Sequence, residues 1–144
     1  MQNPPPVQAS NQPPATVSKS STGLDENVAA LLAYIMTWVS GLVFFLIEKD
    51  SRLVRFHAMQ AILLGAVAAV LAIGLWIISL ITVVILGQIS GVLSTLVSLV
   101  LGLLSLVLFA AIVIAWIMCL IKAYQGQFYK LPILGPYAEK FSMK

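Results

Sequence analysis

The sequence predicts an all-α membrane protein, a bundle of three transmembrane helices between a disordered N-terminal tail and a short basic C-terminal tail. Apolar residues make up 60% of the chain and charged residues only 9%, far from the composition of soluble globular domains. Residues 58–121 contain no Asp, Glu, Lys, Arg or His, and residues 27–47 form a second such stretch. Both exceed the roughly 20 residues that cross a hydrocarbon core. Neither shows the polar face of a helix buried in a soluble protein.

Residues 1–23 are predicted to be the disordered tail. They hold five of the seven prolines together with Gln, Asn, Ser and Thr, a composition that buries too little apolar surface to fold. A flexible linker is the favoured interpretation, and a docking motif for a proline-recognising module is the alternative. Because the first apolar run follows this polar segment and is too long for a signal peptide, we expect the mature chain to begin near Met1.

The transmembrane domain is expected over residues 24–121, and its first span over about 28–47. Asp25 and Glu26 precede this span, where the N-terminal end of a helix dipole favours acidic side chains. The Val, Leu, Ile and Phe side chains of the run favour insertion strongly enough to outweigh its few polar residues.

The second span is expected over about 58–86. Asp50 or Ser51 can cap its helix, which carries Arg52 and Arg55 in its first turns. The helix thus enters the membrane directly from a charged loop.

A turn signal at residues 87–91 separates the second span from the third, expected over about 92–121. One straight helix of that length would measure about 45 Å, longer than the hydrocarbon core of roughly 30 Å. It must therefore tilt, kink near Gly102 or begin along the interface, and a fourth short helix within 87–121 is left open. Residues 122–144 are expected to lie on the membrane as a basic interfacial tail.

Counting basic residues gives the expected topology. Three spans place the N-terminal tail and the turn at 87–91 on one side, and the charged loop and the C-terminal tail on the other. Seven of the eight basic residues then share a side, with only Lys19 opposite. A fourth span would divide them evenly, which the positive-inside rule disfavours. The prediction is a multi-pass protein of the cell membrane with the N-terminus outside and the C-terminus in the cytoplasm.

No catalytic, cofactor or metal site is predicted. His57 is the only histidine and lies seven residues from Asp50, about 10 Å along a helix, so the spacing gives no hydrogen-bonded dyad. His57, Cys119, Glu48 and Asp50 have no known ligand spacing. A satisfied interfacial histidine is favoured over a ligand, and a buried Cys119 is favoured over an acylated one.

The candidate interaction corner consists of Arg52, Arg55, Phe56, His57 and Gln60, where the second helix enters the membrane. Arg52 and Arg55, three apart on a helix, can clasp the phosphate of an anionic lipid, although ordinary positive-inside anchoring is favoured. The expected partners are membrane lipids, copies of the same chain or other membrane proteins. No basic stripe indicates nucleic acid.

Small residues recur four apart in every run. The rows are Ala29, Ala33, Thr37 and Gly41; Ala61, Gly65 and Ala69; and Ser90, Ser94, Ser98 and Gly102. Helix packing is the favoured interpretation, and a polar path along the serine row of an oligomer is the alternative. Spans without ionisable residues argue against an ion-coupled transporter.

Ordered motifs carry a resemblance to a known family. They read LDENVAALLAY at 24–34, FLIEK at 45–49, VRFHAMQA at 54–61, KAYQG at 122–126 and YKLP at 129–132, followed by Gly135 and AEK at 138–140. In these segments the chain resembles a family of small uncharacterised prokaryotic multi-pass membrane proteins. More distantly it is similar to the chloroplast inner-envelope protein-import component of the Tic-twenty type. The first resemblance implies a membrane protein of unassigned activity, and the second implies a channel or import role.

These observations predict a non-enzymatic integral membrane protein that assembles with itself or with other membrane proteins. A pore or protein-translocation component is the alternative, suggested by the serine row and the import relative. A membrane enzyme acting on lipid through His57 and Arg55 is the third hypothesis.

Overall fold

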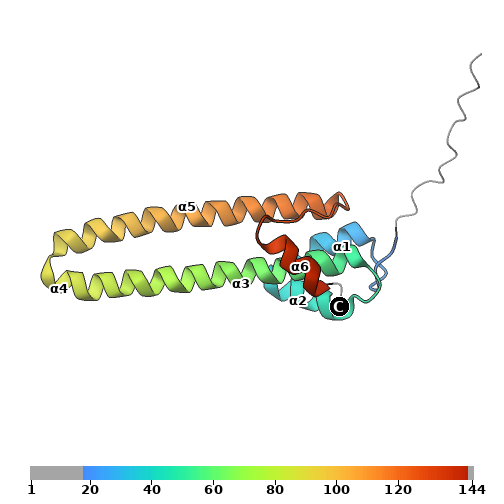
Figure 1. The fold of residues 1–144 in the computed structure, drawn as a ribbon, viewed down its shortest axis with the longest axis horizontal. Helices are drawn as coiled ribbons and strands as arrows, with labels where there is room; N and C mark the ends of the chain where they lie inside the picture. Colours follow the sequence, from blue (N-terminus) through green and yellow to red (C-terminus); the bar gives the residue numbers. More distant parts are fainter. Residues whose placement is uncertain (1–17, 143–144) are drawn as a thin grey trace, which may run out of the picture.

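Two long antiparallel helices form the body of the computed structural model, which describes residues 18–142 (Figure 1). They are α3 (Arg52–Ile81) and α5 (Gly91–Tyr124). The structure contains no β-strand among the described residues, and its two long helices are accompanied by the shorter apolar helix α2 (Trp38–Ile47). The predicted all-α class is confirmed.

Both long helices are suited to crossing a membrane. The helical stretch Arg52–Ile89 has 38 residues and Gly91–Tyr124 has 34, with mean hydropathies of 2.8 and 2.9 in their most apolar windows. At 1.5 Å per residue they measure about 57 and 51 Å, longer than the hydrocarbon core. Only 6% of the first of these two apolar segments and 0% of the second is buried inside the protein. The exposed apolar side chains are therefore matched to lipid and not to water.

Helix α3 begins where the sequence predicted its N-terminal cap. Ser51 Oγ accepts a hydrogen bond of 3.2 Å from the N–H of Val54. The helix ends in the π-helical turn η1 (Thr82–Leu86) and the short α4 (Gly87–Ile89). Ser90, in extended conformation, reverses the chain and caps α5.

The segment 28–47, predicted as a single span, is not one continuous helix in the structure. It consists of two helices, α1 (Glu26–Leu32) and α2, joined by a turn at residues 33–37 in which Thr37 has φ 48°. Ser40 Oγ compensates for the broken helical bonding, because it donates to Ala33 O at 2.9 Å and accepts from Met36 N at 3.0 Å. Trp116 Nε1 of α5 donates to Tyr34 O at 3.0 Å. The turn is thus stabilised partly from a distant helix, which no local pattern reveals.

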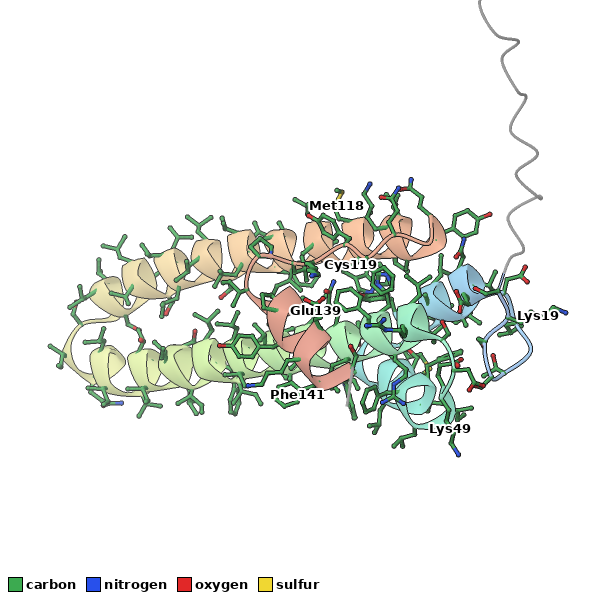
Figure 2. All side chains as sticks on the ribbon, turned by 45° about the vertical axis from the view of Figure 1, so that its right-hand side comes forward. Lys19, Lys49, Met118, Cys119, Glu139 and Phe141 are labelled. Carbon is green, nitrogen blue, oxygen red and sulfur yellow. The ribbon has the colours of Figure 1, made fainter. Side chains whose placement is uncertain are left out.

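The α1–α2 hairpin returns to the end from which it starts. Ser21, before α1, donates from its N–H to both carboxylate oxygens of Glu48, after α2, at 3.0 and 3.1 Å. Lys19 and Lys49 lie at this same end, with α4 at the opposite end of the long helices (Figure 2). The structure thus places the N-terminal segment at the end of the long helices away from the turn at 87–91, unlike the predicted arrangement.

The hairpin covers only part of the length of α3. A Cβ on Gly41 of α2 would lie 2.8 Å from Ala58 O, and a Cβ on Gly65 of α3 would lie 2.8 Å from Trp38 Cβ. Gly65 is 13 residues beyond Arg52, so α2 reaches about 20 Å along α3. These contacts also confirm the packing interpretation of the small-residue rows at both glycines.

Two segments outside the long helices differ from the tail predictions. Residues 1–17 of the predicted N-terminal tail lie outside the described residues, but 18–26 form an ordered turn in which Glu26 N donates to Ser18 O at 3.2 Å. In the C-terminal tail, α6 (Leu134–Ser142) packs across α3 (Figure 1). Residues 143–144 lie outside the description.

We call residues 18–65 and 112–142 the packed end and residues 66–111 the distal hairpin. Small side chains bring the helices of the packed end together: Ala29, Ala30, Ala61 and Ala123 are all fully buried in its core. The helical hairpin α1–α2, the ends of α3 and α5, and α6 meet there. The candidate site residues all belong to this end.

Candidate functional site

The five predicted corner residues lie in the first three turns of α3, but they point to different surroundings. His57 and Gln60 are fully buried, Phe56 is 2% exposed, and Arg52 is exposed. The helix therefore divides the corner into a buried polar pair, an arginine held by backbone carbonyls and one wall of a pocket.

His57 is hydrogen-bonded at both ring nitrogens. Nε2 lies 3.0 Å from Gln127 O, and Nδ1 lies 3.3 Å from the hydroxyl of Tyr34. Because a carbonyl oxygen can only accept, Nε2 carries the proton and Nδ1 accepts from the tyrosine. The ring also makes edge contacts with Tyr34 and Phe56, at centroid distances of 5.8 and 5.2 Å. This matches the satisfied histidine favoured from sequence.

Gln60 links α3 to α5 and to the segment that follows α5. Its Nε2 donates to Cys119 Sγ and to Tyr129 O, both at 3.2 Å, while its Oε1 is buried without a hydrogen-bond partner. Cys119 itself is fully buried. The position of the thiol supports the buried interpretation of this cysteine over acylation.

Gly126 places the returning segment over these side chains. Its φ of +68° lies in the left-handed region that ends many helices, and the side chain of Asn27 packs where a Cβ would be. The chain then runs back along α3, where Gln127 and Tyr129 offer their carbonyls to His57 and Gln60.

Arg55 joins the loop before α3 to the end of α6. Its Nη1 donates to Glu48 O at 3.0 Å and its Nε to Ser142 O at 3.1 Å. The guanidinium also lies 5.0 Å from the centre of the Phe45 ring, a cation–π contact. Arg55 is thus engaged in holding the fold together.

Glu48 organises the loop between α2 and α3. Its carboxylate accepts from the N–H groups of Ser51, Ser21 and Asp50 and from the Ser21 hydroxyl, at 2.7 to 3.1 Å. Burial by itself raises the pKa of this carboxyl, but the hydrogen bonds to its charged form outweigh burial and lower the pKa from 4.5 to about 2. Glu48 is therefore ionised at neutral pH, although its residue is fully buried.

A pocket of about 370 Å³ opens beside Arg52 and Phe56. Residues of the C-terminal segment complete its lining: Phe128, Lys130, Glu139 and Ser142. Lys130 Nζ and Glu139 Oε2 form an ion pair at 2.6 Å. The sequence indicated the first two residues but not the other four, because it predicted neither the return of the segment after α5 along α3 nor helix α6. The apolar spacing Leu134, Tyr137, Ala138 and Phe141 is the signal that could have revealed this helix.

The polar side chains of this site hold neighbouring segments of the chain together and line a pocket. Between residues 18 and 142, no group of three or more His, Cys, Asp and Glu side chains is placed to hold a metal ion. His57 has both nitrogens engaged and Arg55 is held by two carbonyls, so the two residues of the enzyme hypothesis are committed to structural contacts.

Comparison with known proteins identifies the family. The MamF/MmsF family, described as the magnetosome magnetite crystal formation protein family, matches residues 24–138. Two UPF0132 membrane proteins of Methanocaldococcus jannaschii are 38% and 36% identical to the chain, over 88% and 83% of its length and 96% and 71% of theirs. A UPF0132 membrane protein of Archaeoglobus fulgidus is 36% identical, over 81% of this chain and 95% of its own.

No solved structure gives a significant match. The predicted resemblance to small uncharacterised prokaryotic membrane proteins is confirmed, whereas none of these matches shows the distant similarity to the chloroplast import component. Two long apolar helices and relatives named as membrane proteins agree on the location of the chain. The chain belongs to the MamF/MmsF family and is a membrane protein akin to the archaeal UPF0132 proteins.

Proposed function

We propose that this protein is a non-enzymatic membrane assembly protein that associates with copies of itself through the distal hairpin. The observation that carries the proposal is an apolar hollow of about 640 Å³ between α3 and α5, beyond the part of α3 that α2 covers. Its lining is almost entirely apolar: Ala68, Ala69, Leu71, Ala72, Leu75, Trp76, Ser79, Ser105, Leu108, Phe109 and Ile112.

The surface around the hollow carries both small and large side chains, so it can pack against the same surface of a second copy. Ala68, Ala69 and Ala72 form a wall of small residues that lets another helix approach closely. Trp76 and Phe109, which are 67% and 66% exposed, supply large side chains on the same surface. A two-fold interface requires one surface to offer both parts, because each copy presents the same residues to the other.

Crosslinking in native membranes tests this proposal. Phe109→Cys, in a chain whose buried Cys119 is replaced by Ser, is expected to give a dimer with a short thiol-reactive crosslinker. Leu46→Cys is the matched control, because Leu46 is 67% exposed on the outer side of α2 at the packed end. Equal crosslinking at both positions, or none at Phe109, would overturn self-association through this surface.

The orientation we propose has the packed end in the cytoplasm. Two helices cross the bilayer, while α1 and α2 enter from the cytoplasmic side and return to it. Every basic residue of the described chain belongs to the packed end: Lys19, Lys49, Arg52, Arg55, Lys122, Lys130 and Lys140. The positive-inside rule therefore favours a cytoplasmic packed end more strongly than it favoured the three-span arrangement.

The α1–α2 hairpin, as a re-entrant segment, also provides hydrogen-bond partners for the backbone of its turn. Non-helical backbone at membrane depth is tolerated where protein groups bond it, as Ser40 and Trp116 bond the turn at 33–37. Labelling of single cysteines tests the orientation: Gln88→Cys should react with an impermeant reagent on intact cells, and Lys19→Cys only after permeabilisation. Reaction of Lys19→Cys on intact cells would contradict it.

The pore or translocation alternative depends on the serine row of α5 lining a polar path. Within that row, Ser94 is only 7% exposed and Ser98 Oγ is buried. These placements favour packing against η1 and α3, and we do not advance a pore. Magnetite formation, named in the description of the family, is likewise no part of the proposal, which rests on the apolar surface alone.

A further inference from the structure

We propose that the pocket beside Arg52 binds the phosphate-bearing headgroup of an anionic phospholipid. The pocket, about 370 Å³ in volume, lies between the start of α3, the segment after α5 and α6. This site is separate from the hollow of the distal hairpin, so it does not depend on self-association.

The pocket lies at the level where lipid headgroups are found. Arg52 is the first residue of α3 and stands six positions before Ala58, where the uncharged stretch begins. Residues 128–142, which supply its other walls, follow the end of that stretch at Ile121. The lining therefore marks the boundary between the apolar helices and the charged end of the molecule.

The charges of the lining suit a monoanionic phosphodiester. Arg52 and Lys130 contribute two positive charges and Glu139 one negative charge. Lys130 has three donors, of which the Glu139 carboxylate takes one at 2.6 Å. Arg52 has other interactions in the protein, but its five N–H donors allow it to share them with a phosphate.

Aromatic walls favour a lipid over free phosphate. Phe128, 54% exposed, supplies the accessible apolar surface, and it packs on the buried Phe56 with ring centres 5.5 Å apart. Such a wall suits the glycerol and the first acyl carbons of a lipid, whereas inorganic phosphate has no apolar part to pack there. On α6, which packs against α3, Tyr137 and Phe141 are exposed side chains suited to the membrane interface. Phe141 is labelled in Figure 2.

The test uses the full chain in nanodiscs of phosphatidylcholine with a minor fraction of phosphatidylglycerol. Native mass spectrometry counts the phosphatidylglycerol that stays bound after release from the disc. Arg52→Gln and Lys130→Gln should each weaken retention about fivefold, the effect expected of one basic residue at a membrane surface. Glu139→Gln should strengthen retention, because it removes the competing carboxylate from Lys130.

Lys49→Gln is the matched control, since it removes the same charge from an exposed position outside the pocket. Retention by Lys49→Gln should equal that of the parent. If all three basic substitutions weaken retention equally, general surface charge explains binding and the pocket proposal is overturned. The Glu139→Gln variant keeps the test decisive should Arg52→Gln fail to fold, because unchanged or weaker retention there also contradicts it.

A competition arm distinguishes lipid from free phosphate. Inorganic phosphate added to the discs should leave bound phosphatidylglycerol in place, because it lacks the apolar contact with Phe128. Displacement of the lipid by inorganic phosphate would overturn the assignment to phospholipid.

Discussion

At the packed end, helices approach closely around hydrogen-bonded polar side chains, whereas the distal hairpin consists of two helices whose large apolar side chains are mostly exposed. His57 and Gln60 are fully buried at the packed end and bond to three other segments of the chain. In the distal hairpin a few polar side chains such as Ser94 are buried between the helices, but large apolar side chains such as Val70 and Ile73 of α3 are 71% and 59% exposed. The first region depends on contacts within the chain, while the second depends on what surrounds it. Substitutions of the same kind should therefore have unequal effects in the two regions.

The largest difference is expected for glycine substitutions on the helices of the two regions. Gly41→Leu should destabilise the fold by about 3 kcal/mol, because its Cβ would meet the backbone oxygen of Ala58 at 2.8 Å. Gly74→Leu has nothing within 4 Å of the added Cβ and should be neutral or stabilising by up to about 1 kcal/mol. Unfolding in detergent, followed by circular dichroism, measures both. Equal losses would mean that α2 does not pack on α3 as described.

The next effect concerns Glu48, whose hydrogen bonds belong entirely to the packed end. Its folded-state pKa of about 2 lies below the ordinary 4.5, so its contribution is complete above pH 4.5 and is lost as the pH falls toward 2. Glu48→Gln should cost about 2 kcal/mol at neutral pH, because it removes a charged acceptor from four donors. Melting temperatures of parent and variant between pH 2 and pH 7 should converge at the acid end.

Asp25→Asn serves as the control for this titration, since Asp25 begins α1 without a side-chain capping bond. At neutral pH that variant should lose less stability than Glu48→Gln, because an acidic side chain at a helix N-terminus contributes only about 0.3 to 1 kcal/mol. A gap between parent and Glu48→Gln that persists unchanged at low pH would show that the carboxylate is not the stabilising species.

A smaller effect separates the two tryptophans of the long helices. Trp116→Phe should cost about 1 kcal/mol, because Tyr34 O loses its donor at the turn between α1 and α2. Trp76→Phe, at a position 67% exposed in the distal hairpin, should change the melting temperature less. If Trp76→Phe proved the more damaging, the distal surface would be the more constrained of the two.

The sequence contained the fold class but not the path of the first apolar run. Residues 58–121 could be recognised as membrane helices because an uncharged apolar stretch of that length is typical of transmembrane segments. The run 27–47 met the same test of length and hydropathy, yet it is a hairpin. The bonds that allow its turn come from Ser40 within the run and from Trp116, 82 residues after Tyr34. Hydropathy does not reveal a contact between residues so far apart in the sequence.

The candidate site was recovered in part for a similar reason. Arg52, Arg55, Phe56, His57 and Gln60 could be singled out because polar residues at a helix entry are conspicuous in an apolar chain. Their different surroundings depend on which face of α3 each occupies and on which segment returns to it. The other residues that line the pocket come from 128–142. Tertiary packing of α6 and of the segment before it brings them beside α3, and local charge counting does not describe that packing.

The smallest effect is expected where the chain faces lipid. Val70→Ala removes two methyl groups from a side chain that is 71% exposed and outside the lining of the hollow. In a bilayer these methyl groups contact lipid whether or not the helices are packed, so the change in unfolding free energy should stay within about 0.5 kcal/mol. Val54→Ala is the matched substitution at a fully buried position of the same helix and should cost distinctly more. Chemical unfolding in mixed micelles compares the two. A loss at Val70 as large as at Val54 would place protein, not lipid, against that face of α3, and would extend the contact surface of the distal hairpin beyond the hollow.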